Sequence, residues 1–222
     1  MQRTSGKLTI VNHPLVQDEL ATLRDNTTPL DQFRASAERL LPVLILEASK
    51  DLYTHPGTVM TRSGSTASVS RISQGLVVVE ILRAAQSMVS PVLALYPSAR
   101  IGVLGIKRDE EHGCVPVSYY CNLPSDMDRD LILVVDPMLA TGGSACEAIA
   151  LIKKALGVES SRLIKLVCVI AAEEGVRKVA AEHPEVDIIT AACDPNLNDK
   201  KYIVPGLGDF GDMWHGTEPK KT

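Results

Sequence analysis

The stretch from Leu131 to Leu156 constrains the fold more than any other part of the chain. Its first five residues, Leu131 to Val135, are all apolar and predict a strand buried on both faces, as in a parallel sheet under helices. Small residues follow at 141–144, and apolar residues then recur at helical spacing up to Leu156. This order of strand, glycine-containing loop and helix predicts an α/β fold around a parallel sheet.

The loop between this strand and helix has the chemistry of a phosphate site. The free N–H groups of the first helical turn and the helix dipole favour an anion there. Gly142 and Gly143 let the backbone approach that anion, and Thr141 and Ser144 add hydroxyl donors. Asp136 suits sugar hydroxyls instead, so the stretch predicts a ribose 5-phosphate ligand. The same residue types also serve ordinary strand–helix turns, which is the alternative interpretation.

Four other apolar segments predict the remaining strands of a parallel five-stranded core sheet flanked by helices. They lie at 76–79, 101–106, 163–170 and 186–190. Helical patterns follow the first of these strands and recur at 144–156 and 173–182, which predicts right-handed crossover connections.

The first fifty residues predict helices outside the sheet. One helix is expected to begin at Pro14, after a structural His13, and a second after Thr28, which can cap it. Pro42 is expected to kink or divide the second helix. Small and polar residues at 57–73 predict a protruding β-hairpin.

A charged run at 107–116 separates two of the predicted strands. Such a run is usually a solvated loop. Because it leaves the sheet at the same edge as Asp136, it is also placed to act as a mobile cover over the phosphate site.

Composition limits the class of protein. A chain of 222 residues with 45% hydrophobic content suits one α/β domain spanning 1–222. The net charge of −4, without a basic block, argues against nucleic-acid and membrane-surface binding. Five cysteines without C-x-x-C spacing argue against disulfides and zinc, and no segment is apolar for long enough to span a bilayer. We therefore expect a cytoplasmic protein.

Two motif matches are rejected on their context. Residues 206–211 fit G-x-G-x-x-G, but too few residues follow for the helix and strand of a dinucleotide-binding unit. Asp194 opens a sequence spaced like an EF-hand loop, but Asp199 and Pro205 replace its required glycine and glutamate.

Two segments carry a resemblance to a known family. The run at 134–144, Val-Val-Asp-Pro-Met-Leu-Ala-Thr-Gly-Gly-Ser, resembles the 5-phosphoribosyl-1-diphosphate (PRPP) motif of phosphoribosyltransferases, in the variant found in uracil phosphoribosyltransferases. The run at 202–212 is similar to the uracil-binding segment of that family, in which backbone groups read the base. The resemblance implies a phosphoribosyltransferase-type fold, with a hood made by the N-terminal helices and the C-terminal segment.

The resemblance also assigns roles to residues. Arg83, Arg108 and Asp209 are implied as catalytic residues. The implied PRPP site comprises Arg83, Arg108, Asp136, Pro137, Met138, Leu139, Ala140, Thr141, Gly142, Gly143, Ser144 and Asp209. The implied uracil site comprises Ile203, Gly208, Asp209 and Phe210.

The resemblance implies that uracil and PRPP form uridine 5′-monophosphate (UMP) and diphosphate. Mg²⁺ would come with PRPP, with no metal held by protein ligands alone. The resemblance also leaves room for a GTP effector and implies a homodimer or larger homo-oligomer.

Three departures from the family pattern keep alternatives open. Glu80, Ala85 and Glu173 stand where proline, glycine and proline are common. A carboxylate at 80 would repel a diphosphate unless Arg83 or a magnesium ion intervenes. The alternatives are a phosphoribosyltransferase for another base and a non-catalytic nucleotide-binding regulator with this fold.

Overall fold

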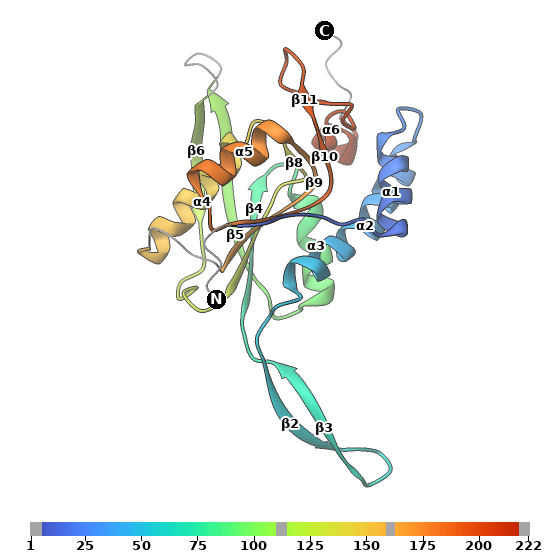
Figure 1. Ribbon diagram of the computed structural model, residues 1–222, viewed down its shortest axis with the longest axis vertical. Helices are drawn as coiled ribbons and strands as arrows, with labels where there is room; N and C mark the ends of the chain where they lie inside the picture. Colours follow the sequence, from blue (N-terminus) through green and yellow to red (C-terminus); the bar gives the residue numbers. More distant parts are fainter. Residues whose placement is uncertain (1–5, 110–114, 159–162, 218–222) are drawn as a thin grey trace.

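The computed structural model describes residues 6–109, 115–158 and 163–217 and has one large sheet at its centre (Figure 1). In spatial order the strands are β1 (Leu8–Ile10), β10 (Asp187–Asp194), β9 (Ile164–Ala172), β7 (Leu131–Val135), β4 (Leu76–Leu82), β5 (Arg100–Asp109) and β6 (Val115–Asn122). Neighbouring strands are parallel except for the antiparallel pair β5–β6. A short strand, β8 (Met138–Leu139), also pairs with β9.

The predicted parallel five-stranded core is confirmed as β10-β9-β7-β4-β5. The strands at its centre are apolar on both faces because helices cover both sides, and every residue of β7 and β9 is buried. The sequence pattern did not predict the two edge strands, β1 and β6. β1 has only three residues, and β6 begins inside the stretch interpreted as a charged loop.

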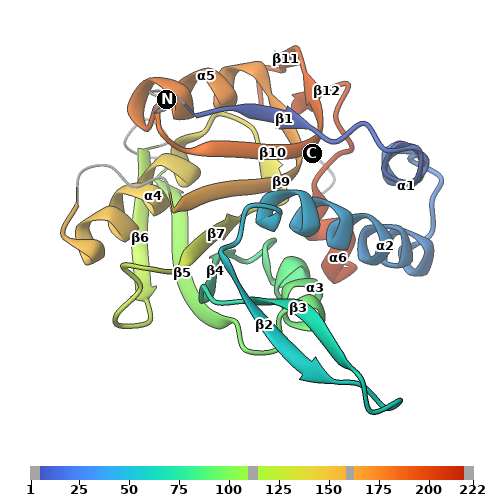
Figure 2. The same ribbon diagram turned by 60° about the horizontal axis from the view of Figure 1, so that its bottom comes forward.

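Helices form one layer on each face of the sheet (Figure 2). One layer contains α1 (Pro14–Arg24), α2 (Leu30–Ser49), α3 (Gln86–Leu95) and α6 (Phe210–His215), and the other contains α4 (Gly143–Leu156) and α5 (Glu173–Glu182). Strand β4 shows the alternation that separates the two cores. Leu76 and Val78 pack on the first layer, whereas Val77 and Val79 pack on the second.

Two expectations for the N-terminal helices require correction. Of the two effects expected from Pro42, a kink or a division of the helix, the second does not occur, because α2 is one continuous 20-residue helix that contains Pro42. Its N-cap is Pro29 rather than Thr28, whose hydroxyl instead donates to the Thr22 carbonyl at 2.7 Å. The expectation for His13 holds, because its Nδ1 accepts the N–H of Leu15 and caps α1.

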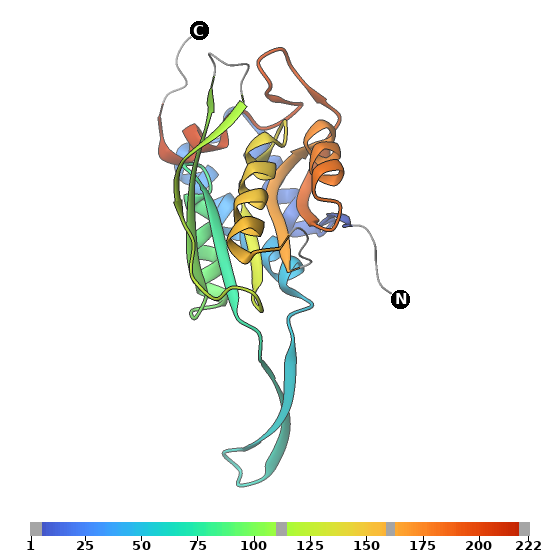
Figure 3. The ribbon, with the colours of Figure 1, turned by 90° about the vertical axis from the view of Figure 1, so that its left-hand side faces the viewer.

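The predicted hairpin projects from the body (Figures 1 and 3). It consists of β2 (Thr54–Met60) and β3 (Thr66–Ile72), paired antiparallel. At the opposite end of the molecule, the antiparallel strands β11 (Asn196–Leu197) and β12 (Ile203–Val204) lead into α6. Arg34 Nε of α2 donates to the Trp214 carbonyl of α6 at 2.8 Å, which joins the N-terminal helices to the C-terminal segment.

The charged run at 107–116 is not simply a loop. β5 continues to Asp109, and β6 begins at Val115 and pairs back onto it. The residues between them, to which the covering role was assigned, lie outside the described part of the chain. Within the described residues, no helix is both long and apolar enough to cross a membrane.

Candidate active site

The carboxyl edge of the sheet gathers the residues predicted to bind PRPP. β7, β4 and β5 are adjacent and parallel, so their last residues reach the same edge. Asp136 follows β7, and Arg83 follows β4 after a cis peptide bond with Leu82. Arg108 is the penultimate residue of β5, and its side chain lies outside what the structure describes.

The predicted phosphate loop surrounds a small hollow at this edge. The hollow is lined by Asp136 and by every residue from Met138 to Ala145. Gly142 caps α4 with a φ of 81°, a left-handed conformation that glycine adopts without strain. Pro137 does not line the hollow, and its carbonyl instead accepts the N–H groups of Val169 and Ile170. The loop therefore surrounds the N-terminus of a 14-residue helix, as an anion site requires.

Gly175 of α5 supports this loop from behind, a role that sequence reasoning missed. A Cβ on Gly175 would lie 2.5 Å from the Ala140 carbonyl oxygen. Conversely, a Cβ on Gly142 would lie 2.9 Å from the Gly175 carbonyl oxygen. The loop and the helix can approach so closely because both contact positions, 142 and 175, are glycine. The one signal in the sequence that could have indicated this contact is the single glycine within the helical pattern at 173–182.

A larger cavity of about 950 Å³ lies between α1, α2, the loop that follows β4 and the C-terminal segment. Arg83, Gly208 and Asp209, all predicted site residues, line it. The predicted base segment 202–212 contributes further lining residues: Tyr202, Pro205, Gly206, Leu207 and Asp212. Residues that the sequence analysis did not single out also line it: Leu23, Arg24, Asp25, Asn26, Phe33, Lys200, Met213 and Thr217. The cavity is therefore enclosed partly by the hood that the resemblance implied.

Two contacts bring the three predicted segments together. The N–H of Phe210 donates to Met138 Sδ at 3.3 Å, which joins the base segment to the phosphate loop. A Cβ on Gly211 would lie 3.2 Å from the Ala84 Cβ, so the start of α6 packs on the loop that follows β4. The Arg83 loop, the phosphate loop and the base segment thus meet at one place.

Two residues predicted for the uracil site do not line the cavity with their side chains. Ile203 is buried in the core below the loop. Phe210 is fully buried, with its ring centroid 5.1 Å from that of Phe33 and stacked on Trp214 at 6.3 Å. Their part in base recognition stays a prediction and concerns their backbone groups. Asp209 caps α6 by accepting the N–H of Asp212 at 3.0 Å and also faces the cavity.

Glu80, the departure most at odds with diphosphate binding, is buried in β4 and is not among the residues that line either cavity. Its Oε2 has no hydrogen-bond partner among the described residues. Burial raises the pKa of this carboxyl group, which favours its neutral form. Both its burial and its absence from the two cavity linings reduce the repulsion expected from the sequence.

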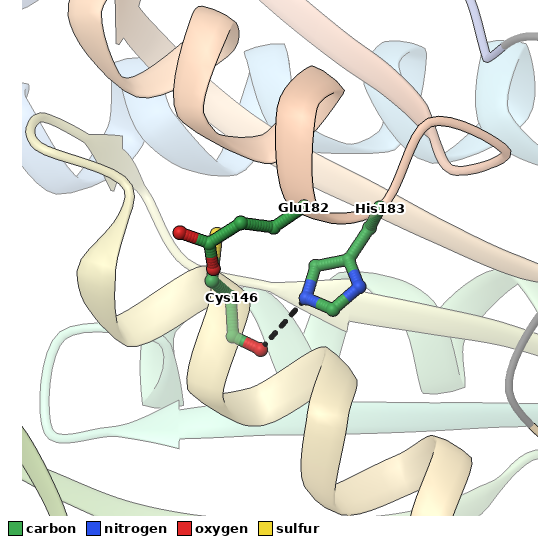
Figure 4. Close-up of side chains that lie close together, drawn as sticks. All are labelled: Cys146, Glu182 and His183. Atoms are coloured by element: carbon green, nitrogen blue, oxygen red, sulfur yellow. Dashed lines mark hydrogen bonds between the residues drawn. The ribbon is translucent and has the colours of Figure 1, made fainter.

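Figure 4 shows Cys146, Glu182 and His183. Among the described residues, these are three side chains of kinds that bind metal ions, and their ligand atoms lie close together. Both ring nitrogens of His183 already have partners, because Nε2 contacts the Cys146 carbonyl and Nδ1 contacts Lys153 Nζ at 2.9 Å. Burial, reinforced by Glu182, raises the pKa of the Cys146 thiol to about 12. A neutral thiol beside a lysine ammonium is a poor cation site, so this group is a packing contact between α4 and α5.

Comparison with known proteins agrees with this geometry. A family model described as uracil phosphoribosyltransferase matches residues 10–217. A uracil phosphoribosyltransferase of Halalkalibacterium halodurans is 43% identical over 213 residues, which cover 96% of this chain and all of that protein. One from Dictyoglomus thermophilum is 44% identical over 209 residues, covering 94% of this chain and 99% of that protein.

A solved structure of a protein from Aquifex aeolicus superposes with a TM-score of 0.85 at 34% identity, covering 95% of this chain and 99% of that one. The fold expected from the sequence is thereby confirmed as that of a phosphoribosyltransferase. With the motif, the loop geometry and these relatives in agreement over nearly its whole length, the chain belongs to the uracil phosphoribosyltransferase family.

Proposed function

We propose that this protein transfers the 5-phosphoribosyl group of PRPP to N1 of uracil and releases UMP and diphosphate. The convergence of the Arg83 loop, the phosphate loop and the base segment beside one cavity is the observation that carries the proposal. Family membership supports the same reaction.

In this proposal the phosphate loop anchors PRPP. Residues 138–144 bind the 5′-phosphate through backbone N–H groups and the hydroxyls of Thr141 and Ser144. Asp136, beside them, accepts hydrogen bonds from the ribose hydroxyls, and Pro137 shapes the connection to β8. Anchoring both ends of the sugar phosphate fixes C1′ relative to the base, which lowers the entropic cost of reaching the transition state.

Two arginines act on the leaving group. Breaking the C1′–diphosphate bond develops positive charge on the ribose and negative charge on the diphosphate. Arg83, which is exposed in the cavity, and Arg108, on the next strand, stabilise that negative charge through their permanently charged guanidinium groups. Asp209 lies on the same cavity wall and faces the developing positive charge.

The base is read by backbone groups of the C-terminal segment. Gly208 has a positive φ and is exposed, and a Cβ there would meet nothing within 4 Å, so its backbone is open to the cavity that it lines. Backbone N–H and C=O groups near Ile203, Gly208 and Phe210 would pair with the carbonyls and N3–H of uracil.

Mg²⁺ fits this site as an ion brought by PRPP. Among the described residues, no three ligand side chains at the cavity lie close enough together to hold one ion, and magnesium bound to substrate phosphates needs only one or two protein carboxylates. Asp209 lines the cavity, as Arg83 does, and is a carboxylate suited to this role. When bound, the ion would neutralise part of the diphosphate charge.

The direct test is PRPP-dependent formation of UMP by the purified protein with Mg²⁺, measured by chromatography, with cytosine, orotate, adenine and hypoxanthine as competing bases. We expect UMP alone to form at a substantial rate. Turnover of a different base would support a phosphoribosyltransferase of other specificity. Tight binding of UMP without turnover would support a non-catalytic regulator.

The remaining properties suggested by family resemblance belong to the same proposal. They are one domain over 1–222, a cytoplasmic location, a homodimer or larger assembly, and a GTP effector. Light scattering with and without GTP tests the assembly, and the rate of UMP formation with and without GTP tests the effector.

A further inference from the structure

The loop at 205–208 depends on a contact outside the phosphoribosyltransferase motifs. Gly206 has a φ of 63°, and a Cβ there would lie 2.1 Å from the Ile203 carbonyl oxygen, so the chain turns back sharply on itself. The side chains of Ile203 and Leu207 on either side of the turn are buried in the core. Residues 205–208 all line the cavity, so the geometry of this turn determines which backbone groups the cavity presents.

Both polar backbone groups of Gly206 are held by one partly buried ion pair. Its N–H donates to Asp194 Oδ2 at 2.8 Å, and its carbonyl accepts from Arg24 NH1 at 2.7 Å. Arg24 also binds Asp194 through two hydrogen bonds of 2.7 Å, one to each carboxylate oxygen. The last residue of α1, the last residue of β10 and the loop are thus joined in one network.

The network compensates for the free-energy cost of burying the charged Asp194 carboxylate. The Asp194 side chain is only 8% exposed, so burial alone would raise its pKa. Hydrogen bonds from Arg24 and Gly206, together with the charge of Arg24, outweigh burial and hold the pKa of Asp194 below its usual range. The carboxylate therefore stays charged and keeps its three hydrogen bonds.

Arg24 and Gly206 also line the large cavity together with Gly208 and Asp209. We propose that Arg24 and Asp194 are positioning residues for base recognition, which hold Gly206 so that the backbone groups of 207–209 face the pyrimidine. This inference rests on the proposed function of the cavity. The phosphate loop is held by other contacts, with Gly175 and α4, so PRPP binding does not depend on this pair.

The test compares Arg24→Gln with a matched control, Arg39→Gln. Arg39 also binds a buried carboxylate, Glu19, through two nitrogens and also belongs to the N-terminal helices, but this pair links α1 to α2 and not to the base loop. For Arg24→Gln we expect the KM for uracil to rise by about 10- to 100-fold, the effect of losing charged hydrogen bonds, with the KM for PRPP within about twofold. For Arg39→Gln we expect both KM values to stay within about twofold.

Two further variants separate positioning from general stability. Arg24→Lys should be nearly as impaired as Arg24→Gln, because one ammonium group cannot bridge both Asp194 oxygens and the Gly206 carbonyl. The double variant Arg24→Gln/Asp194→Asn should be no worse than Arg24→Gln alone, because the pair acts as a unit.

A readout without turnover completes the test. Amide hydrogen exchange of the peptide covering 203–210 should accelerate in Arg24→Gln and not in Arg39→Gln. The inference is overturned if Arg24→Gln raises both KM values equally, or if it changes the uracil KM and the loop exchange no more than Arg39→Gln does. A wild-type protein that neither forms nor binds UMP would refute the proposed function itself. That result differs from an active enzyme whose uracil KM does not change in Arg24→Gln, which would refute only the role of Arg24.

Discussion

Replacing Gly175 by alanine should impair PRPP use from a position behind the phosphate loop. The new Cβ would lie 2.5 Å from the Ala140 carbonyl oxygen and 3.0 Å from that of Leu139, whereas ordinary contact begins at 3.4 Å. The difference, 3.4 minus 2.5, requires the loop backbone to retreat by about 0.9 Å. Displacement of a positioning element by about 1 Å can lower an enzymatic rate by about 100-fold.

The same substitution should not unfold the protein. Gly175 lies in the first turn of α5, where alanine favours the helix over glycine by up to about 1 kcal/mol, which offsets part of the steric cost. We therefore expect kcat/KM for PRPP to fall by up to about 100-fold while the melting temperature changes little. Steady-state kinetics at saturating uracil and a thermal melt of the same sample measure both quantities.

Gly57→Ala is the matched control, because a Cβ there meets only Val69 Cγ2 at 3.8 Å, in the hairpin far from the site. It should leave kcat/KM for PRPP unchanged. A Gly175→Ala protein with wild-type kinetics would refute the reasoning, because it would show that α5 rather than the phosphate loop gives way.

Three other predictions follow from the site and its surroundings. Arg83→Ala should lower kcat by an amount equivalent to about 2–4 kcal/mol with little loss of stability, measured by steady-state kinetics and thermal melts. Phe210→Ala should destabilise the fold by about 3–5 kcal/mol in urea unfolding but keep the preference for uracil over cytosine. Gly208→Val should abolish uracil use and leave PRPP binding intact. Burial raises the pKa of Glu80 in the folded state, so the contribution of this group to wild-type stability should fall as the pH rises above about 4.3. Thermal melts from pH 4 to 8 should show that Glu80→Gln lacks this part of the pH dependence.

Each of these predictions has a contrary outcome. Wild-type turnover by Arg83→Ala would remove the arginine from the reaction. Cytosine use by Phe210→Ala would mean that the side chain, not the backbone, selects the base. Parallel pH profiles for Glu80→Gln and the wild type would place the unfolded and folded pKa values of Glu80 close together.

The local parts of this protein could be predicted from its sequence. The apolar run at 131–135, the glycines at 142–143 and the spacing after them specify a strand, a turn and a helix through interactions between residues only a few positions apart. The expectation that Pro42 would divide the second helix failed for a related reason. The rule for proline in helices describes an isolated segment, whereas α2 is held by a face of buried residues packed on the sheet.

Long-range contacts decided the rest. Nothing near Arg24 in the sequence indicates that it meets Asp194, 170 positions away, because only the folding of α1 over the end of β10 brings the two charges together. The same holds for Gly175 behind the phosphate loop and for the burial of Phe210 between Phe33 and Trp214. Sequence periodicity reports which face of an element is apolar, but only tertiary packing determines which distant residues share that face and which backbone groups remain open to a ligand.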